Sequence, residues 1–199
     1  MDKYPRTIFA SAVALGAAVT ILAFSEVGQG AGNDYPYQFG LLATVRISAL
    51  YFLIAFVAGP LYQLTKADWL AKVISNRRYI GLSFAFVHSI HLGFIILWIN
   101  ANPGLAEAMT LIVGGIAYLL MYLQALTSNN YSFTLLGKYW RWLHNFSMYY
   151  LWFIMTVTFS GHNYVTARIF TGVFLVALLV RILALFKRRQ NRARKLSEA

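Results

Sequence analysis

Six long apolar segments alternate with short polar connections along this chain. A helix that crosses the hydrocarbon core of a membrane needs about 20 mostly apolar residues. The segments that meet this requirement are Ile8–Phe24, Phe39–Tyr62, Tyr79–Asn100, Ala108–Thr127, Tyr139–Phe159 and Val165–Phe186. They are continuously apolar rather than alternating, and a helix satisfies its own backbone inside lipid. The pattern therefore predicts an all-α fold, an integral membrane bundle of six transmembrane helices.

The connections between these segments are too short to hold a soluble domain. We therefore expect residues 1–199 to form a single six-helix transmembrane domain. A basic start followed by an apolar run is also typical of a secretory signal peptide. We expect the run Ile8–Phe24 to be kept as the first membrane anchor instead.

Lysine and arginine gather in alternate connections. Thirteen of the 17 lie before the first segment, in the second and fourth connections, or after the last segment. None lies in the connections 25–38, 101–107 and 160–164. Because cytoplasmic loops carry such an excess, we expect cytoplasmic N- and C-termini in a multi-pass protein of the cell inner membrane. The six cations of the tail 187–195 would also contact anionic membrane lipids.

Composition supports a membrane protein and excludes several other classes. Of the 199 residues 59% are hydrophobic and 12% are charged, and the mean hydropathy is +0.59. An ordinary soluble domain has about twice this charged fraction. The net charge of +11 does not indicate a nucleic-acid partner, because most of the cations lie at membrane ends. The absence of cysteine excludes disulfides, thiolate-held clusters, thiolate zinc sites and cysteine nucleophiles.

Three of the four histidines, His88, His91 and His144, lie in apolar segments, whereas His162 lies in a connection. A lone helical histidine is more often a hydrogen-bonded polar residue than a ligand. In a helical bundle without cysteine, however, imidazoles are the usual ligands of a b-type haem. His88 and His91 share one helix face, so they cannot bind one iron from opposite sides. One is a candidate ligand, and the other would bond a propionate or a water. Zinc is disfavoured, because no carboxylate lies nearby in the sequence.

Arginines also lie inside the apolar segments. Arg168 and Arg181 lie nearer the ends of the last segment, from where their side chains can extend to the membrane surface. Arg46 lies deeper, and no acid lies in any segment. Arg46 is therefore a candidate to bind a haem propionate, a lipid phosphate or backbone carbonyls, unless it extends to the outer face.

Several short motifs resemble those of the ferric-reductase-like transmembrane family, over about residues 40–160. The run Arg77-Arg78-Tyr79-Ile80-Gly81-Leu82, followed by His91-Leu92, is similar to the family's RRxLGL…LH segment, and Gly59-Pro60-Leu61 lies where the family ends its second span. Further matches are to the branch of haem-binding membrane subunits of periplasmic methionine-sulfoxide reductase systems. These are Ala125-Leu126-Thr127-Ser128 for ALTS, and Leu136-Gly137-Lys138, Trp140 and Leu143-His144 for LGKxWxxLH.

The resemblance implies a b-type cytochrome with haem held between the third and fifth helices. Such a protein is an electron-transfer subunit of an oxidoreductase rather than a complete enzyme. It takes electrons from quinol or flavin on the cytoplasmic side and passes them to an outer acceptor or partner. The resemblance implies His91 and His144 as axial ligands of the haem iron. It places Val157 where the family has a further histidine, and valine cannot bind iron.

Depth along the helices separates the two histidines that the resemblance implies. His91 lies about 20 Å beyond Arg78, and His144 lies about 4.5 Å beyond Arg141. If both arginines mark the cytoplasmic edge, His91 and His144 mark two levels rather than one pair. At the outer level His91 would meet His162, with Met155 a weaker candidate. At the inner level His144 would face the region of Arg77, where relatives place a histidine.

Two functions therefore remain open. The first is a membrane cytochrome subunit with one haem b, or two, working with a protein partner and with quinone or with flavin held by a partner. The second is a haem-poor or haem-free relative that serves as a structural or assembly subunit of a larger membrane complex. The missing histidine at Val157 motivates this alternative.

Overall fold

Each apolar segment forms a helix, so the predicted all-α class is confirmed. The computed structural model describes residues 4–26, 28, 37–104 and 108–198. Within these residues the helices are α1 (Tyr4–Phe24), α3 (Gln38–Thr65), α4 (Asp68–Ser75), α5 (Arg77–Ala101), α6 (Ala108–Leu126), α7 (Asn130–Leu136), α8 (Lys138–Ser160) and α9 (Val165–Ser197). The short helices α4 and α7 lie in connections that the apolar pattern leaves without an element.

By length and composition, fewer helices qualify as membrane spans than the six apolar segments predict. In the described part of the chain, α1, α3, α5 and α9 are each long and apolar enough to span a membrane. A fifth candidate arises if α6 and α7, which are bent by 105° at their junction, count as one broken span. Helix α8 has 23 residues but carries Arg141, His144 and Asn145. The structure therefore gives four or five candidate spans, and six crossings remain a prediction.

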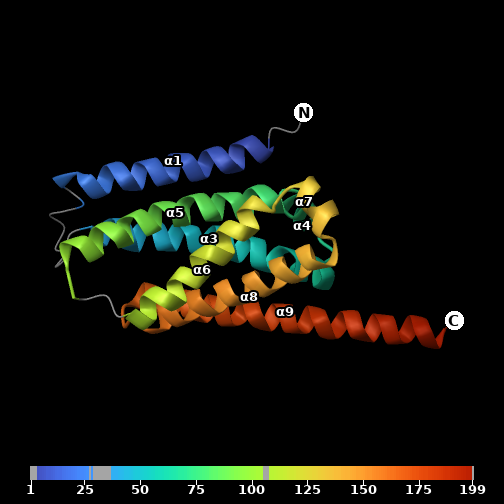
Figure 1. Ribbon diagram of the computed structural model, residues 1–199. Helices are drawn as coiled ribbons and strands as arrows, with labels where there is room; N and C mark the ends of the chain where they lie inside the picture. The colour runs from blue at the N-terminus through green and yellow to red at the C-terminus, as the bar shows by residue number, and fades with distance from the viewer. Residues whose placement is uncertain (1–3, 27, 29–36, 105–107, 199) are drawn as a thin grey trace.

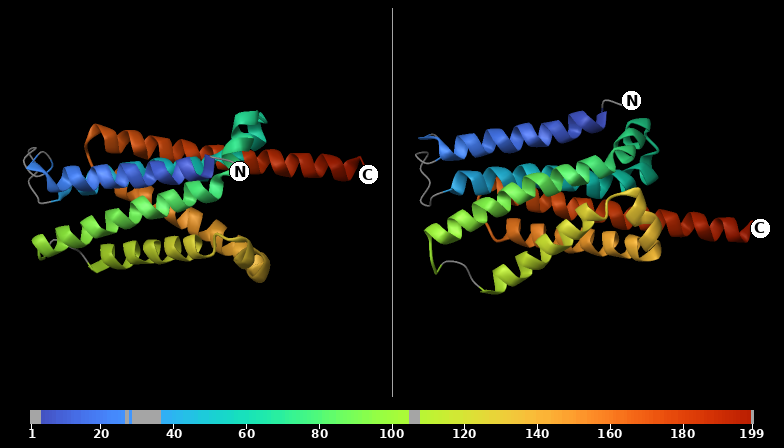
Figure 2. Two further views of the ribbon diagram at one scale, coloured as in Figure 1. Left: turned by 90° about the horizontal axis from the view of Figure 1, so that it is seen from above. Right: turned by 45° about the horizontal axis from the view of Figure 1, so that its top comes forward.

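The long helices lie side by side along a common direction (Figure 1). Helix α3 packs against α5 and α9, α8 packs against α9 and α6, and α1 packs on α5 and α3. Figure 2 shows α1 at one edge, away from α8 and α9. The start of α1 and the end of α9 lie at the same end of the bundle, together with α4 and α7 (Figure 1). We call this the inner end and the opposite one the outer end.

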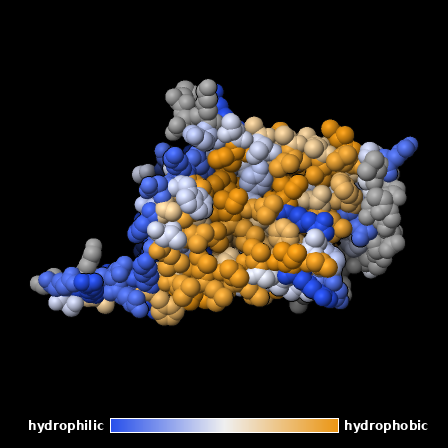
Figure 3. Space-filling model, turned by 180° about the vertical axis from the view of Figure 1, so that it is seen from behind, coloured by the Kyte–Doolittle hydropathy of each residue, from blue (hydrophilic) through white to orange (hydrophobic). Residues whose placement is uncertain are grey.

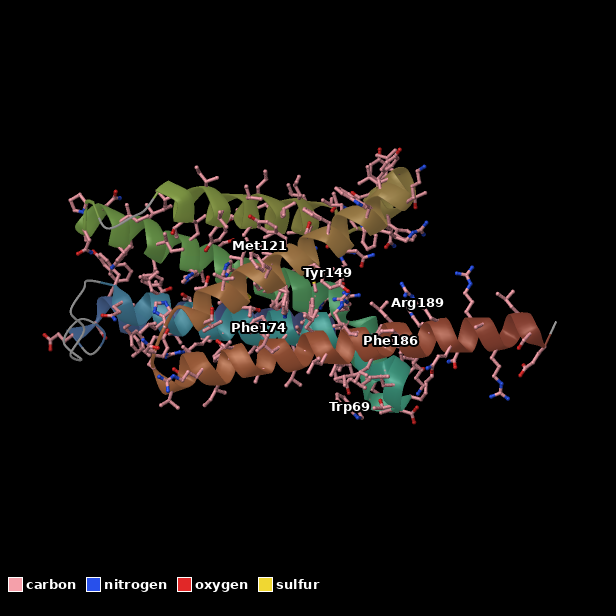
Figure 4. The ribbon with its side chains drawn as sticks, turned by 90° about the horizontal axis from the view of Figure 1, so that it is seen from below. Trp69, Met121, Tyr149, Phe174, Phe186 and Arg189 are labelled. Carbon is pink, nitrogen blue, oxygen red and sulfur yellow. The ribbon has the colours of Figure 1, made fainter. Side chains whose placement is uncertain are left out.

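Aromatic rings from several helices meet in the centre of the bundle. The ring centroid of Phe52 in α3 lies 5.4 Å from those of Phe56 and Phe84 and 6.0 Å from that of Phe174. Phe174, from α9, lies among the packed helices in Figure 4. The face seen in Figure 3 is largely apolar, and most of its hydrophilic residues lie toward the two ends. Such a broad apolar surface is what lipid would cover.

Pro60 lies inside α3 rather than at its end. The resemblance places the end of the second span at Gly59-Pro60-Leu61, but the helix continues to Thr65. Proline has no N–H, so it leaves the carbonyl four residues earlier without its helical partner. That carbonyl, of Phe56, accepts a hydrogen bond from Arg181 Nη1 at 3.4 Å. The Arg181 guanidinium also lies over the rings of Phe56 and Tyr149. The expectation that Arg181 extends to the membrane surface is therefore wrong, because its side chain turns into the bundle.

Helix α9 continues well beyond its apolar part and carries the basic tail. Its 33 residues correspond to about 50 Å. Arg189 lies where α9 leaves the bundle (Figure 4). In the described part of the chain the ion pair between Arg194 and Glu198, at 2.7 Å, is the only one. The buried interior is therefore without paired charges.

Gly40 provides a test of the packing between α3 and α5. A Cβ at this position would lie 2.6 Å from Cδ1 of the buried Phe94 ring, whereas a Cβ at Gly93 would meet nothing within 4 Å. We expect Gly40→Ala to lower the free energy of unfolding by about 1–3 kcal/mol, because overpacking forces neighbours apart. Gly93→Ala is the control and should have no destabilising effect. Thermal unfolding in detergent measures both; equal midpoints would contradict this packing.

Candidate functional site

Two histidines of α5 are held by hydroxyl groups of α3. The hydroxyl of Ser48 lies 3.0 Å from Nδ1 of His88, and that of Thr44 lies 3.0 Å from Nδ1 of His91. The helices run antiparallel, so residues four apart on α3 face residues three apart on α5. Both hydroxyl residues are fully buried.

The protonation of these rings follows from the hydroxyl groups. A hydroxyl has one proton to donate. Thr44 donates to the carbonyl of Gly40 at 2.6 Å, and Ser48 donates to that of Val45 at 3.0 Å. If each hydroxyl keeps its proton on that carbonyl, it accepts from the imidazole, and Nδ1 carries the proton in the neutral ring. Nε2 is then the nitrogen with the free lone pair, as in histidines that bind metals.

Aromatic rings stack on His88 from several sides. Its ring centroid lies 5.2 Å from that of Phe84, 5.1 Å from that of His91 and 5.0 Å from that of Tyr118, and all three pairs are stacked. The hydroxyl oxygen of Tyr118 is buried and has no hydrogen-bond partner in the described part of the chain. His88 is thus packed inside the bundle between the two cavities described below.

An apolar cavity at the outer end contains two of the histidines. It has a volume of about 550 Å³ and lies between α3, α5, α6 and the junction of α8 with α9. His91 and His162 both line it, although 71 residues separate them in the sequence. The other lining residues are mainly apolar or aromatic: Leu41, Leu42, Val45, Ile95, Trp98, Ile99, Leu111, Phe159 and Tyr164, with Gln38, Thr110 and Thr158.

Polar groups around this outer cavity lack partners. Gln38 Oε1, in its wall, is buried and makes no hydrogen bond to a described residue. Arg46 donates from Nη2 to the Thr166 hydroxyl at 3.0 Å and lies over the ring of Tyr164, 5.5 Å from its centroid. Its Nε is buried and likewise has no partner among the described residues. Arg46 therefore retains an unused donor close to a wall of the outer cavity.

A second cavity, at the inner end, contains His144 and three arginines. Its volume is about 520 Å³, and Arg77, Arg78 and Arg141 line it together with His144. The structure therefore brings His144 to the region of Arg77 and places it in a different cavity from His91. Met155 and Val157 line neither cavity; Met155 is buried in the core and Val157 is exposed.

His144 holds the bend between α6 and α7. Its Nε2 lies 3.0 Å from the hydroxyl of Thr127, which itself donates to the carbonyl of Leu123 at 2.6 Å. If the Thr127 proton stays on that carbonyl, Nε2 is the donor in the neutral ring. The Trp140 ring stacks on His144 at 3.8 Å and donates from Nε1 to the Thr127 carbonyl at 2.8 Å. The two motifs that contain Thr127 and His144 thus form one structural unit.

The arrangement suits a porphyrin better than a bare metal ion. In the described residues no group of three or more His, Asp or Glu side chains could hold a metal. A haem supplies four ring nitrogens itself and needs only axial ligands and an apolar pocket. The outer cavity offers imidazoles, apolar walls and an unpaired guanidinium nitrogen nearby, so its residues fit such a group.

The fold and these cavities define a multi-pass helical membrane protein with half-buried imidazoles between its helices. Comparison with known proteins agrees with this class. The chain is similar to the protein-methionine-sulfoxide reductase heme-binding subunit MsrQ of Pasteurella multocida, with 29% identity over 71% of each chain. It is 25% identical to MsrQ of Ralstonia nicotianae, over 89% of this chain and 87% of that one. The resemblance seen in the motifs is thereby confirmed. No family model and no solved structure matches the chain.

The hydroxyl groups next to the histidines are candidate site residues that the sequence did not reveal. Serine and threonine are common in membrane helices and also bond their own helix, so Thr44 and Ser48 carry no distinctive signal alone. Only their four-residue spacing, opposite histidines three apart, would have indicated them.

Removal of the Thr44 hydroxyl tests this orientation. Thr44→Val keeps the shape but leaves the Nδ1 proton of His91 without an acceptor, so we expect a loss of about 1–3 kcal/mol in the free energy of unfolding. Thr171→Val is the matched control, because that hydroxyl bonds only the carbonyl of Ala167 in its own helix. Equal stability of the two variants in denaturant titrations would show that the contact with His91 contributes nothing.

Proposed function

We propose that this protein is a membrane haem-binding subunit that transfers electrons, with one haem b in the outer cavity. The observation that carries the proposal is His91, an imidazole that lines an apolar cavity and has its Nδ1 proton fixed by Thr44. The similarity to MsrQ, named as a heme-binding subunit, supports it.

In this proposal each residue of the outer cavity has a separate task. His91 would hold the haem iron through the Nε2 lone pair, and His162 is the candidate for a second ligand. Arg46 offers its unpaired Nε to a propionate, and the apolar walls keep water away. When bound, haem supplies a one-electron redox couple, which the protein's own side chains lack.

The proposed setting is the cell inner membrane, with six crossings and both termini in the cytoplasm. The basic tail and the inner cavity then face the cytoplasm, and the outer cavity faces the opposite side. Electrons would come from quinol or flavin on the cytoplasmic side. The likeness to MsrQ, which is named as a subunit, supports a protein partner. We propose that this partner is the catalytic subunit of a methionine-sulfoxide reductase on the outer side.

His144 has a different place in this proposal. Its Nε2 proton is donated to the Thr127 hydroxyl. Its Nδ1 is bonded to the ring carbon that carries Cβ, so the side chain itself would hinder a flat macrocycle from approaching Nδ1. Binding of a second haem by Nε2 would require the contact between His144 and Thr127 to break. We therefore propose a structural role for His144 and a single haem.

The absorption spectrum of the purified protein tests haem binding. We expect the reduced-minus-oxidised bands of a b-type cytochrome in the wild-type protein. His91→Ala should lose at least nine-tenths of the bound haem, because the axial ligand is removed. Thr44→Val should retain haem but shift its reduction potential, because the hydrogen bond on Nδ1 raises the basicity of the ligand.

A correctly folded wild-type protein without these bands would contradict the proposal. Circular dichroism of the same sample distinguishes that result from misfolding. A colourless, stable protein would support the alternative of a structural or assembly subunit. Val157, which stands where the family has a histidine, favours that alternative.

The number of haems is tested by His144→Ala. With a single haem in the outer cavity, the ratio of haem to protein should stay at that of the wild type and one potentiometric component should remain. Pyridine haemochrome quantification and redox titration give both values. Loss of half the haem together with one of two components would assign iron ligation to His144 instead.

A further inference from the structure

The inner cavity concentrates positive charge that no acidic residue balances. Arg77 and Arg78 come from the first turn of α5, and Arg141 comes from the first turn of α8. No acid is found among the residues that line the cavity. In the described part of the chain these three guanidinium groups make no ion pair or side-chain hydrogen bond. The cavity therefore offers an anion three unpaired cations.

Helix ends add to this preference. The N-terminus of an α-helix carries a partial positive charge and free N–H groups. Two long helices, α5 with 25 residues and α8 with 23, begin at this cavity. Anionic groups are therefore favoured both by the side chains and by the backbone.

The other wall of the same cavity is apolar. Phe52, Phe84, Met121 and Met148 line it from α3, α5, α6 and α8. A guest that satisfies both walls has a negative head group and an apolar part. A quinone lacks the charge, and an inorganic anion lacks the apolar part.

We propose that the inner cavity binds an anionic phospholipid, with the phosphate at Arg77, Arg78 and Arg141 and acyl chain against the apolar wall. Basic pockets between membrane helices on the cytoplasmic side are where such head groups bind. The inner end of the bundle, where α1 begins and α9 ends (Figure 1), is where we expect lipid head groups to meet the protein. This inference does not depend on haem in the outer cavity.

The charge is tested by the double variant Arg78→Gln/Arg141→Gln. Native mass spectrometry of the purified full-length protein, titrated with phosphatidylglycerol or phosphatidylcholine, measures the binding of each lipid. We expect the wild type to bind one phosphatidylglycerol in preference to phosphatidylcholine, and the variant to bind it about thirtyfold more weakly. Arg188→Gln/Arg189→Gln removes the same charge from the tail of α9 and should keep the affinity of the wild type.

The volume is tested without any change of charge. Gly81 lines the cavity, and a Cβ there would meet nothing within 4 Å. Gly81→Leu should therefore fold, occupy part of the cavity and weaken phosphatidylglycerol binding at least tenfold. Gly93→Leu, on the same helix and equally unhindered but away from the cavity, is the control.

Three results would overturn the proposal. They are equal affinity for the two lipids, equal loss of binding in the cavity and tail variants, and displacement of the lipid by millimolar flavin mononucleotide. The last result would assign the phosphate site to a soluble flavin rather than to a lipid. Retention of phosphatidylglycerol by a preparation that contains no haem would support the lipid site and contradict only the proposed electron-transfer function.

Discussion

A hydroxyl group in a membrane helix has one proton, which it donates in a hydrogen bond to a carbonyl of its own helix. This constraint determines which nitrogen of each half-buried imidazole is free. When Thr44 and Ser48 donate back to carbonyls of α3, His91 and His88 donate to them from Nδ1. The same rule, applied at Thr127, makes Nε2 the donor nitrogen of His144. Three rings of one residue type thus acquire two different free nitrogens, and this difference separates a candidate ligand from a structural tie.

The helices could be predicted from the sequence because apolar length alone defines them. His91 lines one cavity with His162 and His144 lines the other with Arg77, which agrees with the two depths expected from the rise per residue. The role of Pro60 and Arg181 could not be predicted. It depends on the carbonyl of Phe56, which has no helical partner inside α3, and on the rings of Phe56 and Tyr149, which contact Arg181 of α9. These residues are far apart in the sequence, so no short sequence pattern indicates the contacts.

The bend between α6 and α7 shows why short motifs can be specific without being ligands. Thr127, Trp140 and His144 hold one another through a hydroxyl, a carbonyl and two stacked rings. Replacement of Trp140 would leave the Thr127 carbonyl without this donor, and replacement of Thr127 by a residue without a hydroxyl would leave Nε2 of His144 without its partner. A histidine in such a motif is therefore explained by the turn that it stabilises, and the helix positions on either side of the turn then bring Gln124 and Asn145 to the wall of the inner cavity.

None of the six apolar segments contains a carboxylate, and the half-buried Arg46 and Arg181 have no acidic partner among the described residues. Proton relays through membranes usually consist of aspartate, glutamate and histidine chains. Histidines whose ring N–H is hydrogen-bonded to a hydroxyl group are poor members of such a proton relay. An electron that crossed this bundle would thus travel without an accompanying hydrogen ion. Its passage would be electrogenic, and a voltage across the bilayer would speed or slow it according to sign.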